Sequence, residues 1–189
     1  MFDFSLLVAA GLVVVAGLFA MTEAAVSAAS RARAAELARD GVRGARALQA
    51  VAADAPRYVN LLMLLRLGCE MVATTLVALE LVDQLGVGWS AALLTAGSMT
   101  VVSFVAVGVA PRTMGRQHAY TVGRLAAPAV RWLGRALGPL AALLILVGNA
   151  VTPGKGYRDG PFASTVELRE LVDLAEQRGV VEHGEREMI

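Results

Sequence analysis

The chain has 189 residues, of which 57% are apolar and 17% charged, and its mean hydropathy is strongly positive. This composition excludes an ordinary soluble domain and predicts an all-α membrane protein with several spans. The formal net charge is only +1, but its distribution is uneven: no acidic residue occurs from Gln84 to Tyr157, and eight occur from Asp159 to Ile189. The single cysteine, Cys69, excludes a disulfide framework within the chain.

The first apolar run, at about residues 4–21, is long enough to cross the hydrocarbon layer of a membrane as a helix. It has no basic region before it, and Thr22 and Glu23 lead into a long arginine-rich segment, so a first span is favoured over a signal peptide. That segment, residues 31–57, is rich in alanine. It predicts helical structure with breaks at Gly41 and Gly44, and an end at Pro56.

The second predicted span, at about residues 58–82, carries two charged residues in its interior, Arg66 and Glu70. They are four residues apart and therefore share one helix face, where they can form an internal charge pair. One interpretation is a self-neutralised structural pair. The other is that both residues line a cation pathway together with Glu23 and the hydroxyl groups of the third span, because ionisable groups inside a membrane usually face a bundle interior or a polar cavity.

The third predicted span, at about residues 89–110, follows a short turn that ends at Trp89. Its hydroxyl residues include Ser98 and Ser103, and Gly108 and Pro111 predict a break that frees backbone carbonyls near one end. Carboxylate, hydroxyl and carbonyl oxygens are the ligands that hard divalent cations prefer. Small residues of the second and third spans, among them Ala73, Gly97 and Ser98, predict a close helix interface within a homodimer.

The arginines predict the orientation of the chain. Arginine-rich residues 31–57 and 112–135 flank the same side of a three-span bundle, so this side is expected to be cytoplasmic and the N-terminus to lie outside. Residues 128–151 are then expected to form a juxtamembrane helix, because residues 136–151 are short for a span. A short fourth span through residues 136–151 is the alternative. Residues 159–189 predict an acidic cytoplasmic helical segment that is cut short at Ile189.

Two motifs resemble those of the CNNM/CorC magnesium transporter family. Phe19-Ala20-Met21-Thr22-Glu23-Ala24-Ala25 with Ser27 to Arg31 is similar to its Phe-Ser-x-Ser-Glu-x-Ala pattern and the following Ser-x-x-Arg. Gly108-Val109-Ala110-Pro111-Arg112 is similar to its Gly-Glu-x-x-Pro-Lys pattern. The acidic tail resembles the helical segment that precedes the paired CBS domains of the family.

The resemblance implies a homodimeric transmembrane domain over residues 1–158, in a bacterial plasma membrane, and nucleotide binding only through CBS domains absent from this chain. The sequence contains no nucleophile–base pair, phosphate loop or zinc-ligand spacing, so we expect no enzymatic activity, and we expect no nucleic-acid partner. A transported magnesium ion would be bound between the spans, with this candidate set of ligands: Thr22, Glu23, Glu70, Ser98, Ser103 and Gly108.

The chain departs from the family pattern at the expected ion site. Gly108 stands where the family motif has Glu, Cys69 stands where the second span has Asn, and Arg66 adds a fixed positive charge nearby. The sequence therefore predicts either magnesium or divalent-cation efflux through an altered site, or a non-transporting membrane regulator or scaffold in which Arg66 replaces the ion.

Overall fold

The computed structural model describes residues 2–151, with side chains from Phe4 to Gly138. Every element in this part of the chain is a helix, and three stretches are long and apolar enough to span a membrane: Phe4–Ala28, Ala55–Leu85 and Trp89–Gln117. The all-α fold with three spans is thereby confirmed. The predicted acidic segment, residues 159–189, lies outside the described residues. The chain divides into two compact units at residue 144, and the arrangement below is that of the first.

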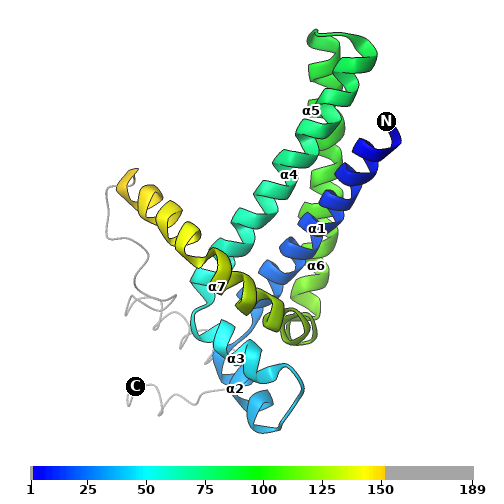
Figure 1. The fold of residues 1–189 in the computed structure, drawn as a ribbon. Coiled ribbons are helices and arrows are strands. Elements are labelled where there is room, and N and C mark those ends of the chain that lie inside the picture. The colour runs from blue at the N-terminus through cyan, green and yellow to red at the C-terminus, as the bar shows by residue number, and fades with distance from the viewer. Residues whose placement is uncertain (1, 152–189) are drawn as a thin grey trace, which may run out of the picture. The chain divides into compact units, whose positions relative to one another are not determined.

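The three spans pack side by side as a bundle (Figure 1). The first is α1 (Phe2–Ala28), the second is α4 (Ala55–Leu85), and the third joins α5 (Trp89–Val102), a π-helix η1 (Ser103–Val109) and α6 (Ala110–Gln117). α1 packs against α4, η1 and α6. The core between α1, α4, α5 and η1 contains a stripe of mostly small residues of α1: Ala9, Val13, Ala16 and Ala20. Small side chains allow the helix backbones to approach closely, which is the usual means of packing helices in lipid.

The third span changes its hydrogen-bonding pattern just before a proline. Pro111 lies in the first turn of α6 and cannot donate a backbone hydrogen bond to the preceding turn. The seven residues of η1 before it take the wider π form, so the predicted break is a change of helix type. η1 also lies close to α1: a Cβ atom on Gly17 would come 2.8 Å from the carbonyl oxygen of Ala106. The span continues to Gln117, beyond the predicted end near residue 110.

Two short helices, α2 (Arg31–Arg39) and α3 (Ala45–Ala53), connect the first span to the second. The Ser30 hydroxyl caps α2 by accepting a hydrogen bond from the backbone N–H of Arg33. Gly41 and Gly44 have positive φ angles, 72° and 82°, so both predicted breaks are confirmed. The expectation for Pro56 was wrong in detail. It lies in the first turn of α4 and so begins the next helix, because the missing N–H has no partner there in any case.

The last described helix is α7 (Ala119–Val151), and its residues up to Leu144 belong to the first unit. Its described side chains pack against α3 and the start of α4 around a core that includes Leu48, Leu62 and Val130. Two glycines of α7 allow this contact, since added Cβ atoms on Gly123 and Gly134 would meet Leu48 and Tyr58. The predicted juxtamembrane helix, residues 128–151, is helical throughout and begins nine residues earlier, at Ala119.

Candidate ion site

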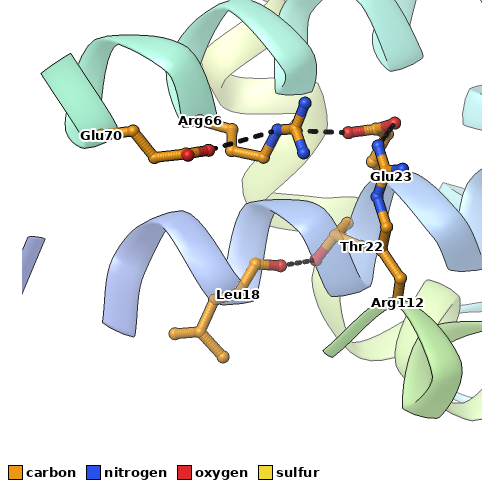
Figure 2. Close-up of polar contacts among 6 residues, drawn as sticks. All are labelled: Leu18, Thr22, Glu23, Arg66, Glu70 and Arg112. Atoms are coloured by element: carbon orange, nitrogen blue, oxygen red, sulfur yellow. Dashed lines mark hydrogen bonds and ion pairs between the residues drawn. The ribbon is translucent and has the colours of Figure 1, made fainter. Parts of the chain in front are cut away.

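Glu23 forms the centre of a charged cluster at the α2–α3 end of the bundle (Figure 2). Its Oε1 atom accepts a hydrogen bond from Arg112 Nη2 at 2.9 Å, a contact that joins α1 to α6. Its Oε2 atom lies 3.8 Å from Arg66 Nε on α4. One carboxylate therefore links all three spans through two guanidinium groups.

Arg66 lies between two carboxylates. Its Nε atom is 3.8 Å from Glu23 Oε2 and 3.7 Å from Glu70 Oε1, one helical turn away on α4. The predicted contact of Arg66 with Glu70 and a further contact with Glu23 are present at the same time (Figure 2). Glu23, Arg66, Glu70 and Arg112 are called the arginine cluster below.

The charged side chains of the arginine cluster are largely shielded from solvent, which strengthens the interactions between their charges. The exposed fractions of the Glu23, Arg66 and Glu70 side chains are 13%, 14% and 16%, and Arg112 is more open at 34%. Yet Arg66 Nε and Glu23 Oε2 have no hydrogen-bond partner, although both atoms are buried. Distances of 3.7 and 3.8 Å are too long for such bonds. The pairing of Arg66 is thus an attraction between charges without directional bonds.

Of the other predicted ligands, Thr22 and Ser98 are hydrogen-bonded within their own helices. Thr22 is buried, and its hydroxyl donates to the carbonyl oxygen of Leu18 at 2.8 Å (Figure 2). Ser98 is exposed and donates to the carbonyls of Leu94 and Thr95. Ser103 and Gly108 are half-buried in η1. Among the described residues, no three His, Cys, Asp or Glu side chains gather as a metal site would require.

The sequence analysis missed Arg112 as a member of the cluster. Its position depends on close packing of α6 on α1, where an added Cβ on Gly115 would overlap the carbonyl of Met21. The available signal was the similar depth in the membrane that the sequence predicts for Glu23 and Arg112. Glu23 and Arg112 have opposite charges and end their spans on the same side of the predicted bundle.

A second buried carboxylate lies near the opposite end of α1 and α4. Glu80 is only 9% exposed. Its Oε2 accepts a hydrogen bond from the Ser5 hydroxyl at 3.0 Å, and its Oε1 accepts one from Gln84 Nε2 at 3.1 Å. Ser5, Glu80 and Gln84 are called the Glu80 cluster; within the described residues it contains no cation.

Residues 7–185 match the sequence profile of the cyclin M transmembrane N-terminal domain, CNNM. The chain belongs to the CNNM family. This agrees with three spans that surround a charged cluster, and it confirms the resemblance found in the two sequence motifs.

Relatives of this CNNM domain include UPF0053 proteins from three bacteria. Those of Mycobacterium bovis and Mycobacterium tuberculosis are each 52% identical over 173 residues, which is 92% of this chain and 40% of theirs. The one from Synechocystis is 26% identical over 173 residues, 92% of this chain and 49% of its own. The chain thus spans less than half the length of the curated relatives it matches.

Proposed function

We propose that this CNNM domain carries divalent cations, magnesium foremost, out of the cell, and that Glu23 and Glu70 bind the ion in transit. The observation that supports this is the position of Arg66, a tethered cation between two buried carboxylates that holds neither by a hydrogen bond. A position between two carboxylates that accommodates a guanidinium group is electrostatically suited to another cation.

Exchange of Arg66 for an ion is physically reasonable. At an effective dielectric constant near 20, two unit charges 4 Å apart interact by about 4 kcal/mol, and a divalent ion at the same place would gain about twice that from each carboxylate. Magnesium would lose part of its hydration shell to enter, and it gives up water reluctantly. Since Arg66 forms no directional bond in the cluster, its departure costs attraction between charges and no hydrogen bond.

Gly108 provides a direct test, because the family motif has Glu at this position. A Cβ atom on Gly108 would lie 3.5 Å from the carbonyl oxygen of Ser103, an ordinary contact, so the backbone leaves room for a side chain. We expect Gly108→Glu to bind magnesium more tightly than the unaltered protein. Gly108→Gln, which has the same shape without the charge, should not.

The decisive experiment measures magnesium binding and flux with the chain in liposomes. We expect saturable magnesium uptake into the lumen or release from it, loss of that flux in Glu23→Gln, and tighter magnesium binding in Arg66→Ala than in the unaltered protein. If neither the unaltered protein nor Gly108→Glu binds or moves magnesium, the transport proposal is wrong.

A second function is supported by the crowding of arginines at the site. With Arg66 and Arg112 both beside Glu23, the cluster is neutral without an ion, as a non-transporting regulator or scaffold would require. In that case the unaltered protein neither binds nor moves magnesium, while Arg66→Ala gains binding. The same titrations therefore separate the two functions.

The proposed setting is a homodimer in the bacterial plasma membrane, with nucleotide acting only through CBS domains in the remainder of the protein. Gly97 and Ser98 are exposed on α5 and available to such an interface, whereas Ala73 is buried against α1 within one chain. A mass measurement in detergent that found only monomer at every concentration would argue against the dimer.

The proposed orientation places the N-terminus outside and the arginine-rich α2–α3 segment inside. Single cysteines introduced at Arg43 and Ser164, in a chain whose Cys69 is replaced by alanine, should both resist an impermeant thiol reagent added to intact cells. Labelling at Ser164 alone would indicate a fourth crossing.

A further inference from the structure

An open pocket of about 350 Å³ lies between the end of α1 and α6. Four of its lining residues come from α1 and two from α6: Glu23, Ala24, Ser27, Ala28, Arg112 and Arg116. The pocket exists because Gly115 lets α6 rest directly on the backbone of α1, so that Arg112 and Arg116, one turn apart, flank the line of contact. The pocket is therefore a result of how α6 packs on α1.

The electrostatics of the pocket favour an anion. Two guanidinium groups line it against one carboxylate, and that carboxylate, Glu23, is 13% exposed and already accepts a hydrogen bond from Arg112 Nη2. Arg116 is exposed and has no ion-pair or hydrogen-bond partner among the described residues. Arginine has five N–H donors, so most of the donors of both side chains remain available. The Ser27 hydroxyl is exposed at the same wall and can add another.

The depth of the pocket suits a phosphate group. The third span has 29 residues, about 43 Å as a helix, which is close to the full bilayer thickness including headgroups. Arg116 is one residue from the end of this span and therefore lies at the level of lipid phosphates and of solutes at the membrane surface. Planar guanidinium groups bind phosphate oxygens with paired hydrogen bonds.

From this we infer that the α1–α6 pocket is a binding site for a phosphate-bearing anion, held by Arg116 and Arg112 together. Its ligand is either the headgroup of an anionic lipid or a soluble phosphate compound, since both present the same oxygens. The pocket adjoins the cation site proposed above and shares Glu23 with it. Arg112 lines the pocket and donates a hydrogen bond to Glu23.

The test uses the whole chain in nanodiscs, with thermal unfolding as the readout. One arm titrates inorganic phosphate into discs of phosphatidylcholine alone, against chloride at equal ionic strength. The other arm replaces part of the phosphatidylcholine with phosphatidic acid, without added phosphate. We expect at least one arm to raise the unfolding temperature, and which arm does so identifies the source of the phosphate group.

Arg116→Ala is the diagnostic variant. Arg116 takes no part in the arginine cluster, so we expect this substitution to leave the fold unchanged. We expect it to weaken the response by about tenfold in phosphate or lipid concentration, the value of one charge-assisted hydrogen bond. Arg46→Ala, an exposed arginine of α3 outside the pocket, is the matched control and should leave the response unchanged. No stabilisation in either arm, or equal loss in both variants, would overturn the assignment.

Discussion

Glu80 and Glu23, two carboxylates that are largely shielded from solvent in the described part of the bundle, are compensated in different ways. Glu80 is satisfied by two neutral donors at hydrogen-bond distance, the Ser5 hydroxyl and the Gln84 amide. Glu23 is balanced by two cations, and only one of its oxygens accepts a hydrogen bond. Neutral donors fix a geometry, whereas charges at 3.7–3.8 Å can exchange partners without breaking a directional bond. The Glu80 cluster therefore serves packing, and the arginine cluster is suited to a change of occupant.

The largest effect is expected from Glu23→Gln. It keeps the shape of the side chain but leaves Arg66 and Arg112 with one carboxylate fewer, and loss of one partner from a buried ion pair costs about 3–5 kcal/mol. The measurement is the free energy of unfolding in detergent. A loss below that of the corresponding Glu80→Gln substitution would contradict the contrast between the two clusters.

Arg66→Ala should follow, with a loss of about 3 kcal/mol, because Glu23 and Glu70 are then left close together without a cation between them. Added magnesium should restore part of the stability by supplying the missing positive charge. The matched control is Arg66→Ala combined with Glu70→Ala, which should be milder and respond less to magnesium. If magnesium stabilises the unaltered protein strongly and Arg66→Ala makes no difference, Arg66 does not occupy the place of an ion.

Gly115→Val tests whether the cluster depends on helix packing. The added side chain would meet the Met21 carbonyl and Ala24, and overpacking of this kind costs about 1–3 kcal/mol. Arg112 should move away from Glu23. Arg112→Ala should therefore cost no further stability when it is added to Gly115→Val, although it destabilises the unaltered protein. Gly11→Val, where an added Cβ has nothing within 4 Å, is the control and should be nearly neutral.

The smallest effect is expected from Glu80→Gln, about 1 kcal/mol, because the amide oxygen keeps one of the two hydrogen bonds and the one that is lost comes from a neutral donor. No cation among the described residues is left unpaired by this change. Magnesium titrations of Glu80→Gln should match those of the unaltered protein. A stability loss as large as that of Glu23→Gln would mean that Glu80 has an ionic role.

The spans and the breaks around α2 and α3 could be predicted from the sequence, but only part of the site could. Long apolar runs and glycines at breaks are local features of the sequence, so the first span, predicted at about residues 4–21, and the turns at Gly41 and Gly44 could be recognised directly. The pair of Arg66 and Glu70 also follows from spacing on one helix. The contact between Glu23 and Arg112 does not, because it depends on how closely α6 packs on α1 at Gly115.

Helix faces in the third span were equally hard to predict. A span that is apolar on all sides has no periodicity to distinguish the face that points inward, so the exposure of Ser98 could not be read from the pattern. The π form of η1 was also hidden, since Gly108 and Pro111 indicate a disturbance without specifying its type.

The π-helix also affects how residues of related chains should be aligned. Hydrogen bonds from i to i+5 enclose one residue more than those of an α-helix, so η1 stores an extra residue without lengthening the span in proportion. Deleting one residue from it would allow an ordinary α-helix that turns through nearly the same angle, because the deletion removes the residue that the wider turn accommodates. Arg112 and Gly115 would then still face α1. Deleting one residue from the regular α-helix of α5 would instead turn everything downstream by about 100°. Among relatives of this chain, a gap of a single position inside residues 103–109 therefore preserves which side chains meet beyond it, whereas the same gap in α5 does not.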